Sequence, residues 1–371
     1  MKILLINWQD RKNPLSGGAE IHIHEIFGRI AKCGHEITFL CSSFKGAEKR
    51  EIVDGMEVLR IGRRSNFNFY VPFATHTLLK NNYDIVIDNI NKIPFFTPLY
   101  VKKVPILAIG YHFFGRIIYY ETNPLFASYV YFTEKLVPKI YKTEVFSVIS
   151  ESTKNDLKGV PDNNIHIISP AIAPEYMPAM DKKSTTPLIV YVGRIKKYKC
   201  LDLLLHSMKT IISEVPNVRL DIVGTGDYIT YLVKLSDELK LNNYVNFVGF
   251  VTEQQKIEIL QSAWMLVNPS AKEGWGITNI EANACGTPVV ASNSPGLRDS
   301  VVNGETGFLV EHGNVNELAT TIVKIIRDTK LREILSQNGI AWAKKFSWDS
   351  AAHKTIQLME TIIQSKETNT L

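Results

Sequence analysis

Short apolar runs alternate with longer amphipathic segments along this 371-residue chain, and that alternation limits its fold more than any other feature. In the first half we predict helices over residues 19–33 and 152–157, and strands over 3–8, 36–41, 85–88, 106–109 and 145–149. Strands that alternate with helices form βαβ units around a mostly parallel sheet. The predicted fold class is therefore α/β.

The second half repeats the pattern after a proline-rich break. Four prolines lie between residues 168 and 187, a density that neither a helix nor a central strand tolerates, so we predict a linker there. A chain of this length exceeds a single core, which favours two domains. Beyond the linker we predict strands over 188–192, 218–223, 245–248, 265–268 and 288–291, helices over 200–214, 228–239 and 253–263, and a last amphipathic helix from 342 onward.

Composition narrows the class of protein. Hydrophobic residues make up 45% of the chain and charged residues 21%, as in an ordinary soluble globular protein. No run of 18 or more uncharged apolar residues occurs, so no membrane span is predicted. The apolar start is short and runs into Asp10, which favours a first strand over a signal peptide. The four cysteines have neither metal-ligand spacing nor disulfide density, which favours a reducing cytoplasm.

Positive charge is concentrated in the first half. Residues 1–170 hold 21 Lys and Arg against 16 Asp and Glu, whereas residues 171–371 are balanced at 21 of each. A basic face can attract anionic lipid or an anionic acceptor. The alternative is a mildly basic soluble surface. Nucleic acid is not expected as a partner, because no recognition motif accompanies the charge.

Two carboxylates, Glu273 and Glu281, flank a glycine-rich turn between the predicted strand 265–268 and the helix that follows it. Gly274 and Gly276 let backbone N–H groups approach a ligand, and a helix N-terminus favours negative charge. A ligand with hydroxyls at both ends and phosphates between them suits this turn, as a nucleotide-sugar does. The alternative is an ordinary solvated helix start.

Two further turns also connect a predicted strand to the helix that follows it. Gly17 and Gly18 open the helix after the first strand without forming a dinucleotide fingerprint. Arg194 and Lys199 follow the first strand of the second half, where a guanidinium and an ammonium could clamp a pyrophosphate. The alternatives are an ordinary helix entry for the first turn and a solvated basic loop for the second.

Together these segments resemble glycosyltransferase family 4, a group of retaining, sugar-nucleotide-dependent enzymes with the GT-B fold. The resemblance spans nearly the whole chain and rests on residues 17–20 (GGAE), 149–154 (ISESTK), 192–194 (VGR) with Lys199, 223–226 (VGTG), 248–250 (VGF), the segment 273–281, 286–291 (GTPVVA), 304–307 (GETG) and 346–348 (FSW). Residues 86–96 are also similar to a run found in a prokaryotic subgroup.

The resemblance implies two doubly wound, Rossmann-like parallel-sheet domains that face each other across a cleft. The expected divisions are an acceptor-side domain at 1–168, a linker at 169–187, a nucleotide-sugar-binding domain at 188–345, and a C-terminal helix at 346–371 that crosses back to the first domain.

Residue roles follow from the resemblance position by position. Glu281 would hold the ribose hydroxyls and Glu273 the donor sugar, while Arg194 and Lys199 would neutralise the diphosphate. His112 matches a histidine that the family places beside the donor sugar. The remaining donor-binding positions are Gly17 and Gly18 from the first domain, Gly224 and Gly226 at the nucleotide pocket, Phe250 and Val251 near the base, and Gly274, Trp275, Gly276, Ile277 and Thr278 at the phosphates or sugar.

The implied reaction is same-face attack by an acceptor hydroxyl, with retention at the anomeric carbon. The resemblance implies no metal and no cofactor beyond the nucleotide-sugar co-substrate, most commonly a UDP-sugar, and the absence of a D-x-D motif agrees. Expected partners are that donor and a glycan, lipid-linked or small-molecule acceptor. The expected location is the cytoplasm, with a possible peripheral position on the inner face of an anionic membrane.

The chain departs from the family pattern in three places. Cys200 follows the clamp lysine where glycine is usual, residues 169–172 replace a common hinge sequence, and Asn89 stands where the subgroup often has an acid. These departures put in doubt the exact position of Lys199, the ease of domain closure and one wall of the acceptor side.

Alternatives remain open at this stage. A GT-B protein that binds or scaffolds without transferring is one, and a GT-B epimerase or phosphorylase is another. The aromatic stretch 111–132 is either an acceptor-side wall that meets a membrane-linked acceptor or a buried helix pair whose rings are core. The second of these is slightly favoured.

Overall fold

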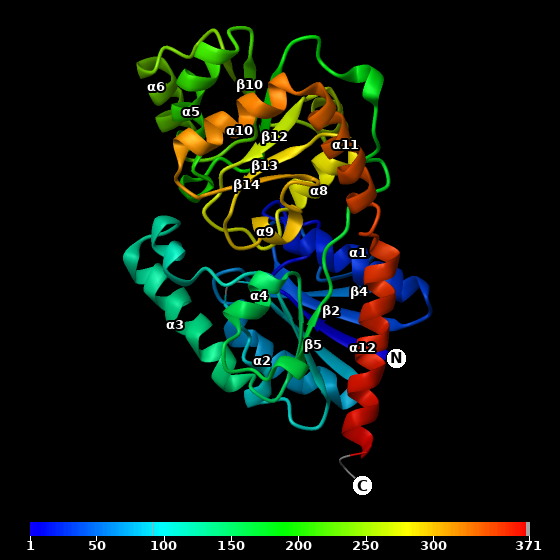
Figure 1. The fold of residues 1–371 in the computed structure, drawn as a ribbon. Helices are drawn as coiled ribbons and strands as arrows, with labels where there is room; N and C mark the ends of the chain where they lie inside the picture. The colour runs from blue at the N-terminus through cyan, green and yellow to red at the C-terminus, as the bar shows by residue number, and fades with distance from the viewer. Residues whose placement is uncertain (92, 369–371) are drawn as a thin grey trace. The chain divides into compact units, whose positions relative to one another are not determined.

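The computed structural model describes residues 1–91 and 93–368, and the chain divides into two compact units. Unit 1 comprises Met1–Pro170 and Trp348–Leu371, and unit 2 comprises Ala171–Ser347. The boundary after Pro170 falls in the proline-rich stretch. Each unit contains its own, mostly parallel sheet covered by helices, so the predicted α/β class with two doubly wound sheets is confirmed (Figure 1).

Over the described residues, the sheet of unit 1 has eight strands in the order β3-β4-β2-β1-β5-β6-β7-β8. Every neighbouring pair is parallel except β3 and β4, which form an antiparallel edge. The strands are β1 (Lys2–Ile6), β2 (Glu36–Ser43), β3 (Arg50–Val53), β4 (Met56–Arg63), β5 (Ile85–Ile90), β6 (Ile106–Gly110), β7 (Val145–Val148) and β8 (Ile165–Ile167).

Helices cover this sheet from both sides. The α-helices of unit 1 are α1 (Gly18–Lys32), α2 (Phe67–Leu78), α3 (Pro124–Ile140), α4 (Glu151–Asp156) and α12 (Trp348–Thr368), and a 3-10 helix, η3 (Gly115–Tyr120), precedes α3. Helix α12 packs along α1, and the ring of Trp348 lies 5.6 Å from that of His22. The last helix of the chain thus belongs to the first unit.

Helices α2 and α3 lie on one face of the sheet. Phe67 of α2 packs in a cluster with Val86 of β5, and Val137 of α3 packs in a cluster with Ile90 of the same strand. Side chains four residues apart on a strand leave the same face. Figure 1 shows α2 and α3 together on the side of unit 1 away from α12.

The sheet of unit 2 has six parallel strands in the order β11-β10-β9-β12-β13-β14 over the described residues. They are β9 (Leu188–Val192), β10 (Arg219–Val223), β11 (Val245–Gly249), β12 (Met265–Asn268), β13 (Val289–Ser292) and β14 (Gly307–Val310). The helices are α5 (Leu201–Glu214), α6 (Ile229–Glu238), α7 (Glu253–Ser262), α8 (Ile277–Ala284), α9 (Leu297–Ser300), α10 (Val315–Arg327) and α11 (Thr329–Ala343), with the 3-10 turn η6 (Lys197–Lys199) after β9.

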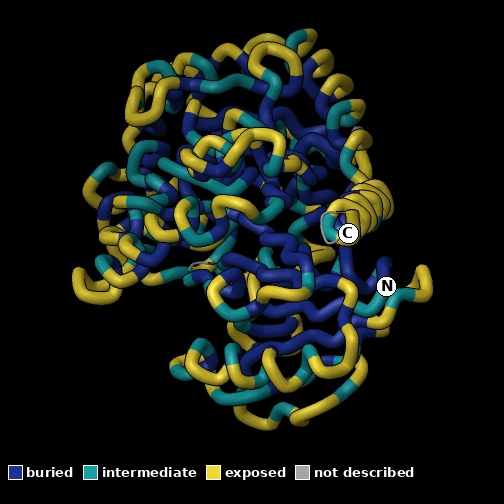
Figure 2. The backbone as a smooth tube through the Cα atoms, turned by 90° about the horizontal axis from the view of Figure 1, so that it is seen from below, coloured by how far each residue is buried: buried dark blue, intermediate teal, exposed yellow. Residues whose placement is uncertain are grey.

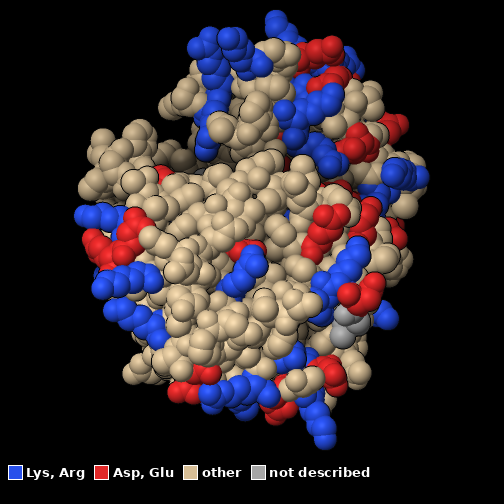
Figure 3. Space-filling model, turned by 90° about the horizontal axis from the view of Figure 1, so that it is seen from above, with Lys and Arg blue, Asp and Glu red and all other residues tan. Residues whose placement is uncertain are grey.

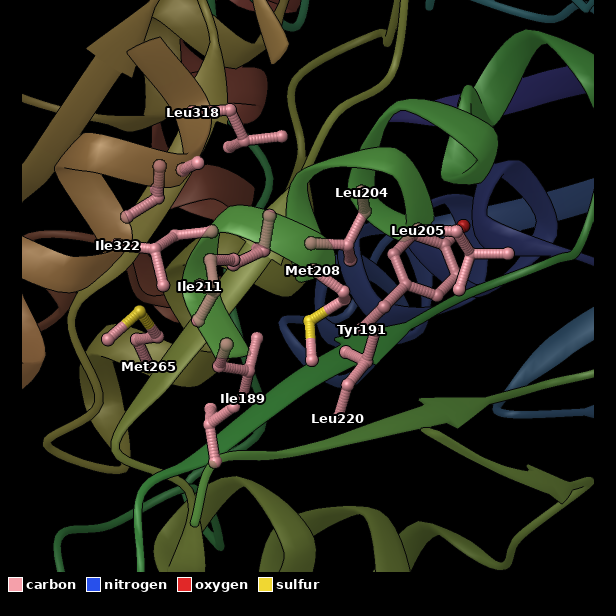
Figure 4. Close-up of a cluster of buried hydrophobic side chains, with 14 of the residues drawn as sticks. Ile189, Tyr191, Leu204, Leu205, Met208, Ile211, Leu220, Met265, Leu318 and Ile322 are labelled. Carbon is pink, nitrogen blue, oxygen red and sulfur yellow. The ribbon is translucent and has the colours of Figure 1, made fainter. Parts of the chain in front are cut away.

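The core of unit 2 lies between its sheet and helices α5 and α10. Leu205 and Met208 of α5 belong to one buried cluster with Ile322 of α10 and Tyr191 of β9, and all four are almost completely buried (Figure 4). Their helical spacing explains why the amphipathic segments could be located from the sequence. In Figure 2 the buried segments form the interior of the chain and exposed segments lie on outer turns.

Several elements differ from the sequence prediction. The predicted elements occur with shifted ends, as β1 at Lys2–Ile6 and α6 at Ile229–Glu238 illustrate. The β3–β4 hairpin and helix α2 were not predicted. For stretch 111–132, the favoured prediction of a buried helix pair is right only in part. The stretch forms η3 and the start of α3, and Tyr111, Phe113 and Phe114 are buried, but the rings further along the stretch are mostly exposed. Within the described residues, none of the helices has the length and apolar character needed to span a bilayer.

Both signs of charge are present on the surface. On the face drawn in Figure 3, basic and acidic side chains surround a broad area with few charged groups. The net charge of +5 therefore does not make this face uniformly basic.

Replacing Leu205 by Ala tests the core of unit 2. The fully buried side chain would leave a cavity, so we expect the free energy of unfolding to fall by about 2–5 kcal/mol. Lys209→Ala, four residues further on the same helix but exposed, should change it by less than about 0.5 kcal/mol. Urea unfolding followed by circular dichroism measures both, and equal losses would contradict the packing described here.

Candidate active site

The carboxyl ends of β9 and β12 are neighbours in the sheet of unit 2, and the loops that leave them carry the predicted charged residues. Ligands in parallel α/β sheets bind beyond these strand ends. The backbone N–H of Ala271 donates to the carbonyl of Tyr198 over 3.0 Å, so the two loops are bonded to each other. The site is built from these joined loops.

An ion pair between Lys199 and Glu273 lies at the centre of this junction. The ammonium Nζ of Lys199 contacts Oε1 of Glu273, and both side chains are mostly buried. Burial alone would lower the pKa of Lys199, but the Glu273 carboxylate and the neighbouring phenols raise it above its ordinary value. Lys199 is therefore protonated at neutral pH. The structure brings together two residues that the sequence placed 74 positions apart.

Cys200 occupies the position where the family pattern has glycine. It adopts a left-handed conformation with φ of +52° and precedes α5. Glycine adopts this conformation at no steric cost, whereas a residue with a Cβ is disfavoured there by about 1 kcal/mol. With Cys200 in place of glycine, the backbone next to Lys199 still has the left-handed conformation that glycine favours, and the cysteine is strained there.

A strap formed by Ser294, Pro295 and Gly296 holds the loop of Glu273 from the other side. The Glu273 N–H donates to the Pro295 carbonyl over 3.0 Å, and the Ser294 hydroxyl donates to the Ser270 carbonyl over 2.8 Å. Gly296 has φ of +83°, and a Cβ there would lie 2.2 Å from the Glu273 carbonyl oxygen. The sequence analysis missed this strap, although a Pro-Gly pair directly after a strand is a turn signal.

The turn from Gly274 to Thr278 leads into α8. Gly276 caps the helix with φ of +77°, and a Cβ there would lie 2.8 Å from Cδ2 of Leu297. The side chain of Trp275 is 3% exposed and packs edge-on against Phe346 at 4.7 Å, so only its backbone is left to meet a ligand. The first N–H groups of a helix lack intrahelical partners and favour an anion.

Glu281 lies on α8, buried, and forms an ion pair with Lys256 of α7 at 3.0 Å. Burial raises the pKa of Glu281, and the Lys256 ammonium opposes that rise. Lys256 also pairs with Glu253 at 3.1 Å and lies 5.1 Å from the ring centre of Tyr176. The sequence analysis did not identify Lys256, because nothing in its local pattern distinguishes it from a solvated helical lysine.

The glycines after β10 allow close backbone packing. A Cβ on Gly224 would lie 1.9 Å from the Gly193 carbonyl oxygen, and one on Gly226 would lie 1.9 Å from the Ile195 carbonyl oxygen. They therefore let the loop after β10 pack against the loop that carries Arg194. Phe250 and Val251 follow β11 at the same end of the sheet, and Phe250 is 82% exposed.

Arg194 is exposed beside this junction. Its backbone carbonyl accepts a hydrogen bond from the buried Tyr191 hydroxyl at 2.9 Å, and its Nη2 lies 3.4 Å from the Tyr198 hydroxyl. The backbone is thus fixed while the guanidinium extends into solvent. Among the described residues no carboxylate forms a salt bridge with it, which leaves its charge available for an anion.

The predicted residues of unit 1 lie at the carboxyl ends of its own strands. Gly17 caps α1, and its N–H donates to the buried Glu20 carboxylate over 2.8 Å, while Gly18 begins the helix. His112 lies two residues beyond β6 with its ring 4.3 Å from that of Phe114. Asn89 is fully buried and donates to Asn7 over 2.6 Å, so it belongs to the interior of the sheet.

No cluster of three or more His, Cys, Asp or Glu side chains suited to a metal ion occurs in the part of the chain that the structure describes.

Two family descriptions match the chain. Residues 173–342 match the glycosyl transferases group 1, and residues 16–176 match glycosyltransferase family 4. An uncharacterized glycosyltransferase of Methanocaldococcus jannaschii is 24% identical over 98% of this chain and 99% of its own length. The capsular polysaccharide biosynthesis glycosyltransferase CapM of Staphylococcus aureus is 39% identical, but over only 41% of this chain and 40% of its own.

Solved structures share the fold. Sucrose-phosphate synthase of Thermosynechococcus elongatus superposes with a TM-score of 0.81 at 21% identity, covering 98% of this chain and 99% of that one. HepE of Anabaena, solved in complex with UDP-glucose, gives a TM-score of 0.77 at 18% identity, covering 97% and 100%.

Replacing Gly296 by Ala tests the strap. The added methyl group must displace the Glu273 backbone and the residue must keep a positive φ, so we expect a loss of about 2–4 kcal/mol in the free energy of unfolding. Gly313→Ala is the matched control, since Gly313 has φ of +88° with open space around it, and it should lose only about 1–2 kcal/mol. Chemical unfolding measures both; equal losses would show that the strap does not press on the loop.

Proposed function

Because the chain belongs to the glycosyltransferases of family 4 and group 1, we propose that it transfers a sugar from a nucleoside-diphosphate donor to an acceptor hydroxyl with retention at the anomeric carbon. The glycosyltransferase class follows from the family. The donor, the stereochemistry and the acceptor are the proposed part. Residues 188–345 are the proposed donor domain, residues 1–168 the acceptor side, 169–187 the linker, and 346–371 the returning helix.

The buried pair of Lys199 and Glu273 is the observation that carries this proposal. It places a fixed ammonium and a carboxylate side by side at the carboxyl ends of adjacent strands. A diphosphate would pair with the Lys199 ammonium, and a sugar hydroxyl would donate a hydrogen bond to the Glu273 carboxylate. A nucleotide-sugar has these two groups next to each other.

The nucleoside end fits the neighbouring elements. Glu281 is proposed to accept hydrogen bonds from the ribose hydroxyls, with the Lys256 ammonium opposing the rise in pKa that burial gives its carboxyl group. Phe250 and Val251 would lie against the base, in a pocket shaped by the close packing at Gly224 and Gly226. A base stacked on an exposed phenyl ring would also bury that ring.

Charge stabilisation is the proposed source of catalysis. As the bond to the sugar breaks, negative charge grows on the leaving diphosphate. Arg194, Lys199 and backbone N–H groups between Gly274 and Thr278, at the start of α8, donate hydrogen bonds to this charge. Preorganised hydrogen-bond donors of this kind supply most of the rate enhancement over the uncatalysed reaction in many enzymes. These groups would neutralise the diphosphate without a metal ion.

Retention is proposed to follow from same-face attack, in which the leaving phosphate oxygen takes the proton of the acceptor hydroxyl. The bond from the anomeric carbon to the diphosphate breaks as the bond to the acceptor oxygen forms. His112 is the proposed neighbour of the donor sugar, and Gly17 and Gly18 are the proposed backbone near the phosphates. The Gly17 N–H already donates to Glu20, so the N–H of Gly18 is the one proposed to meet a phosphate.

The proposed base is uracil, and the proposed acceptor is a cell-surface or lipid-linked glycan at the cytoplasmic side of a membrane. The UDP-glucose complex of HepE supports the first, and the name of CapM supports the second.

Thermal unfolding with UDP, GDP and ADP tests the donor site. A nucleotide at about 100 times its dissociation constant adds roughly 2.7 kcal/mol, enough to raise the melting temperature by several degrees. We expect UDP to stabilise the wild type and Glu281→Gln to lose most of that shift. Glu305→Gln, an exposed carboxylate of the same unit, should keep it. No shift of the wild type with any nucleotide would count against the proposal.

Arg194→Ala tests the clamp. Loss of one charged donor to the leaving group should lower kcat by about 10²–10³ in a transfer assay with the stabilising nucleotide-sugar. The control Lys197→Ala removes an exposed lysine of the same loop and should stay within about twofold of wild type. If both variants keep full turnover, Arg194 has no part in the chemistry.

A further inference from the structure

Helix α2 presents aromatic rings to solvent. Phe69 and Phe73 are 75% and 76% exposed, and Tyr70 between them is 50% exposed. Their spacing of one and four residues places them on one outward face, while Phe67 and Val71 point into the core. Rings of this size rarely stay exposed as a group without a partner.

Helix α3 repeats the arrangement. Its inward side packs through Ala127, Val130 and Val137, which are buried. Its outward side is apolar as well, with exposed side chains spaced over about three turns: Leu125 (79%), Phe126 (61%), Tyr129 (51%), Phe132 (63%) and Leu136 (43%). We call the outward sides of α2 and α3 together the α2–α3 face, since both helices cover the same side of the sheet of unit 1.

The charges around this face are basic. Residues 58–83, which include α2, contain no Asp or Glu but include Arg63, Arg64 and Lys80, all exposed. On α3 the exposed charges are Lys135 and Lys139.

The acidic groups of η3 and α3 themselves are turned away or partly covered. The Glu134 carboxylate points inward, where it accepts from the N–H groups of Phe114 and Gly115 over 2.8 and 2.9 Å. Glu121, at the end of η3, is half-buried.

A hollow adjoins the apolar side chains. Arg116, Tyr119, Tyr120 and Tyr131 line a surface cavity of about 540 Å³ between η3 and α3. Lys135 lies over the ring of Tyr131 at 4.6 Å, and Lys135 and Arg116 lower the pKa of the Tyr131 phenol. A guanidinium surrounded by phenol groups suits a phosphate oxygen at a boundary between water and apolar material.

We propose that the α2–α3 face is a docking surface for an anionic phospholipid bilayer, with its apolar side chains in the headgroup–acyl boundary and Arg116 in contact with a lipid phosphate. Outward Phe, Tyr and Leu with basic flanks are the features of helices that lie in a membrane interface. This docking surface rests on the proposed function, because it would bring the site to the lipid-linked acceptor proposed there.

The charge pattern favours a membrane over a second copy of the chain. A two-fold interface through this face would place the same basic residues of both copies close together, and their repulsion would oppose association. An anionic bilayer instead complements Lys135, Lys139 and the arginines before α2.

Co-sedimentation of the full chain with phospholipid vesicles tests the proposal. Vesicles of phosphatidylcholine with 30% phosphatidylglycerol, at low salt, should bind the wild type at least about tenfold more strongly than phosphatidylcholine alone. The double variant Phe126→Ser, Phe132→Ser should lower that binding about tenfold, and so should Lys135→Gln combined with Lys139→Gln. No binding of the wild type to the anionic vesicles would overturn the proposal.

The matched control is Met177→Ser with Ile334→Ser, two exposed apolar side chains of unit 2, which should bind within about twofold of wild type. Equal losses in the control and the α3 variants would overturn the assignment of this face. Light scattering checks for self-association: a dimer that the α3 variants dissociate would identify a second copy as the occupant and overturn the proposal. The UDP-induced thermal shift, measured in the same variants, reports donor binding separately, so either proposal can fail alone.

Discussion

The charge of Lys199 is the constraint on which the site in unit 2 depends. A mostly buried ammonium is costly unless a partner is held in place, and removing one member of such a pair leaves the other unpaired at a cost of several kcal/mol. Glu273 supplies the partner, and its position depends on hydrogen bonds from Ala271 to Tyr198 and from Glu273 to Pro295. Gly296 lets the strap approach the Glu273 backbone closely, and the left-handed Cys200 ends the 3-10 turn that carries Lys199.

The general architecture could be predicted from the sequence because it depends on local periodicity. Strand ends could be found within a few residues, and in a parallel sheet all carboxyl ends meet at one edge, so the neighbourhood of Lys199 and Glu273 followed from topology. The roles assigned to Glu281, His112 and the glycines came from the family resemblance, and they stay predictions.

Other features could not be predicted, because they depend on partners distant in sequence. Lys256 has the local pattern of any helical lysine, and only the fold brings it to Glu281. Helix α3 is apolar on two sides, so periodicity could not decide which side is buried, and its outward rings were wrongly predicted to be core. The β3–β4 hairpin is short and half-exposed, which weakens its alternation.

Helix α12 has a consequence for the order in which the protein takes shape. It packs on α1, yet it is translated only after all of unit 2. Translation proceeds at roughly 5–20 residues per second. The face of α1 around His22 therefore stays exposed, without α12 packed on it, for roughly ten to forty seconds after the sheet of unit 1 has left the ribosome. The first unit to be synthesised is thus the last to be completed, and during that interval the uncovered face of α1 is open to chaperones and to misassociation.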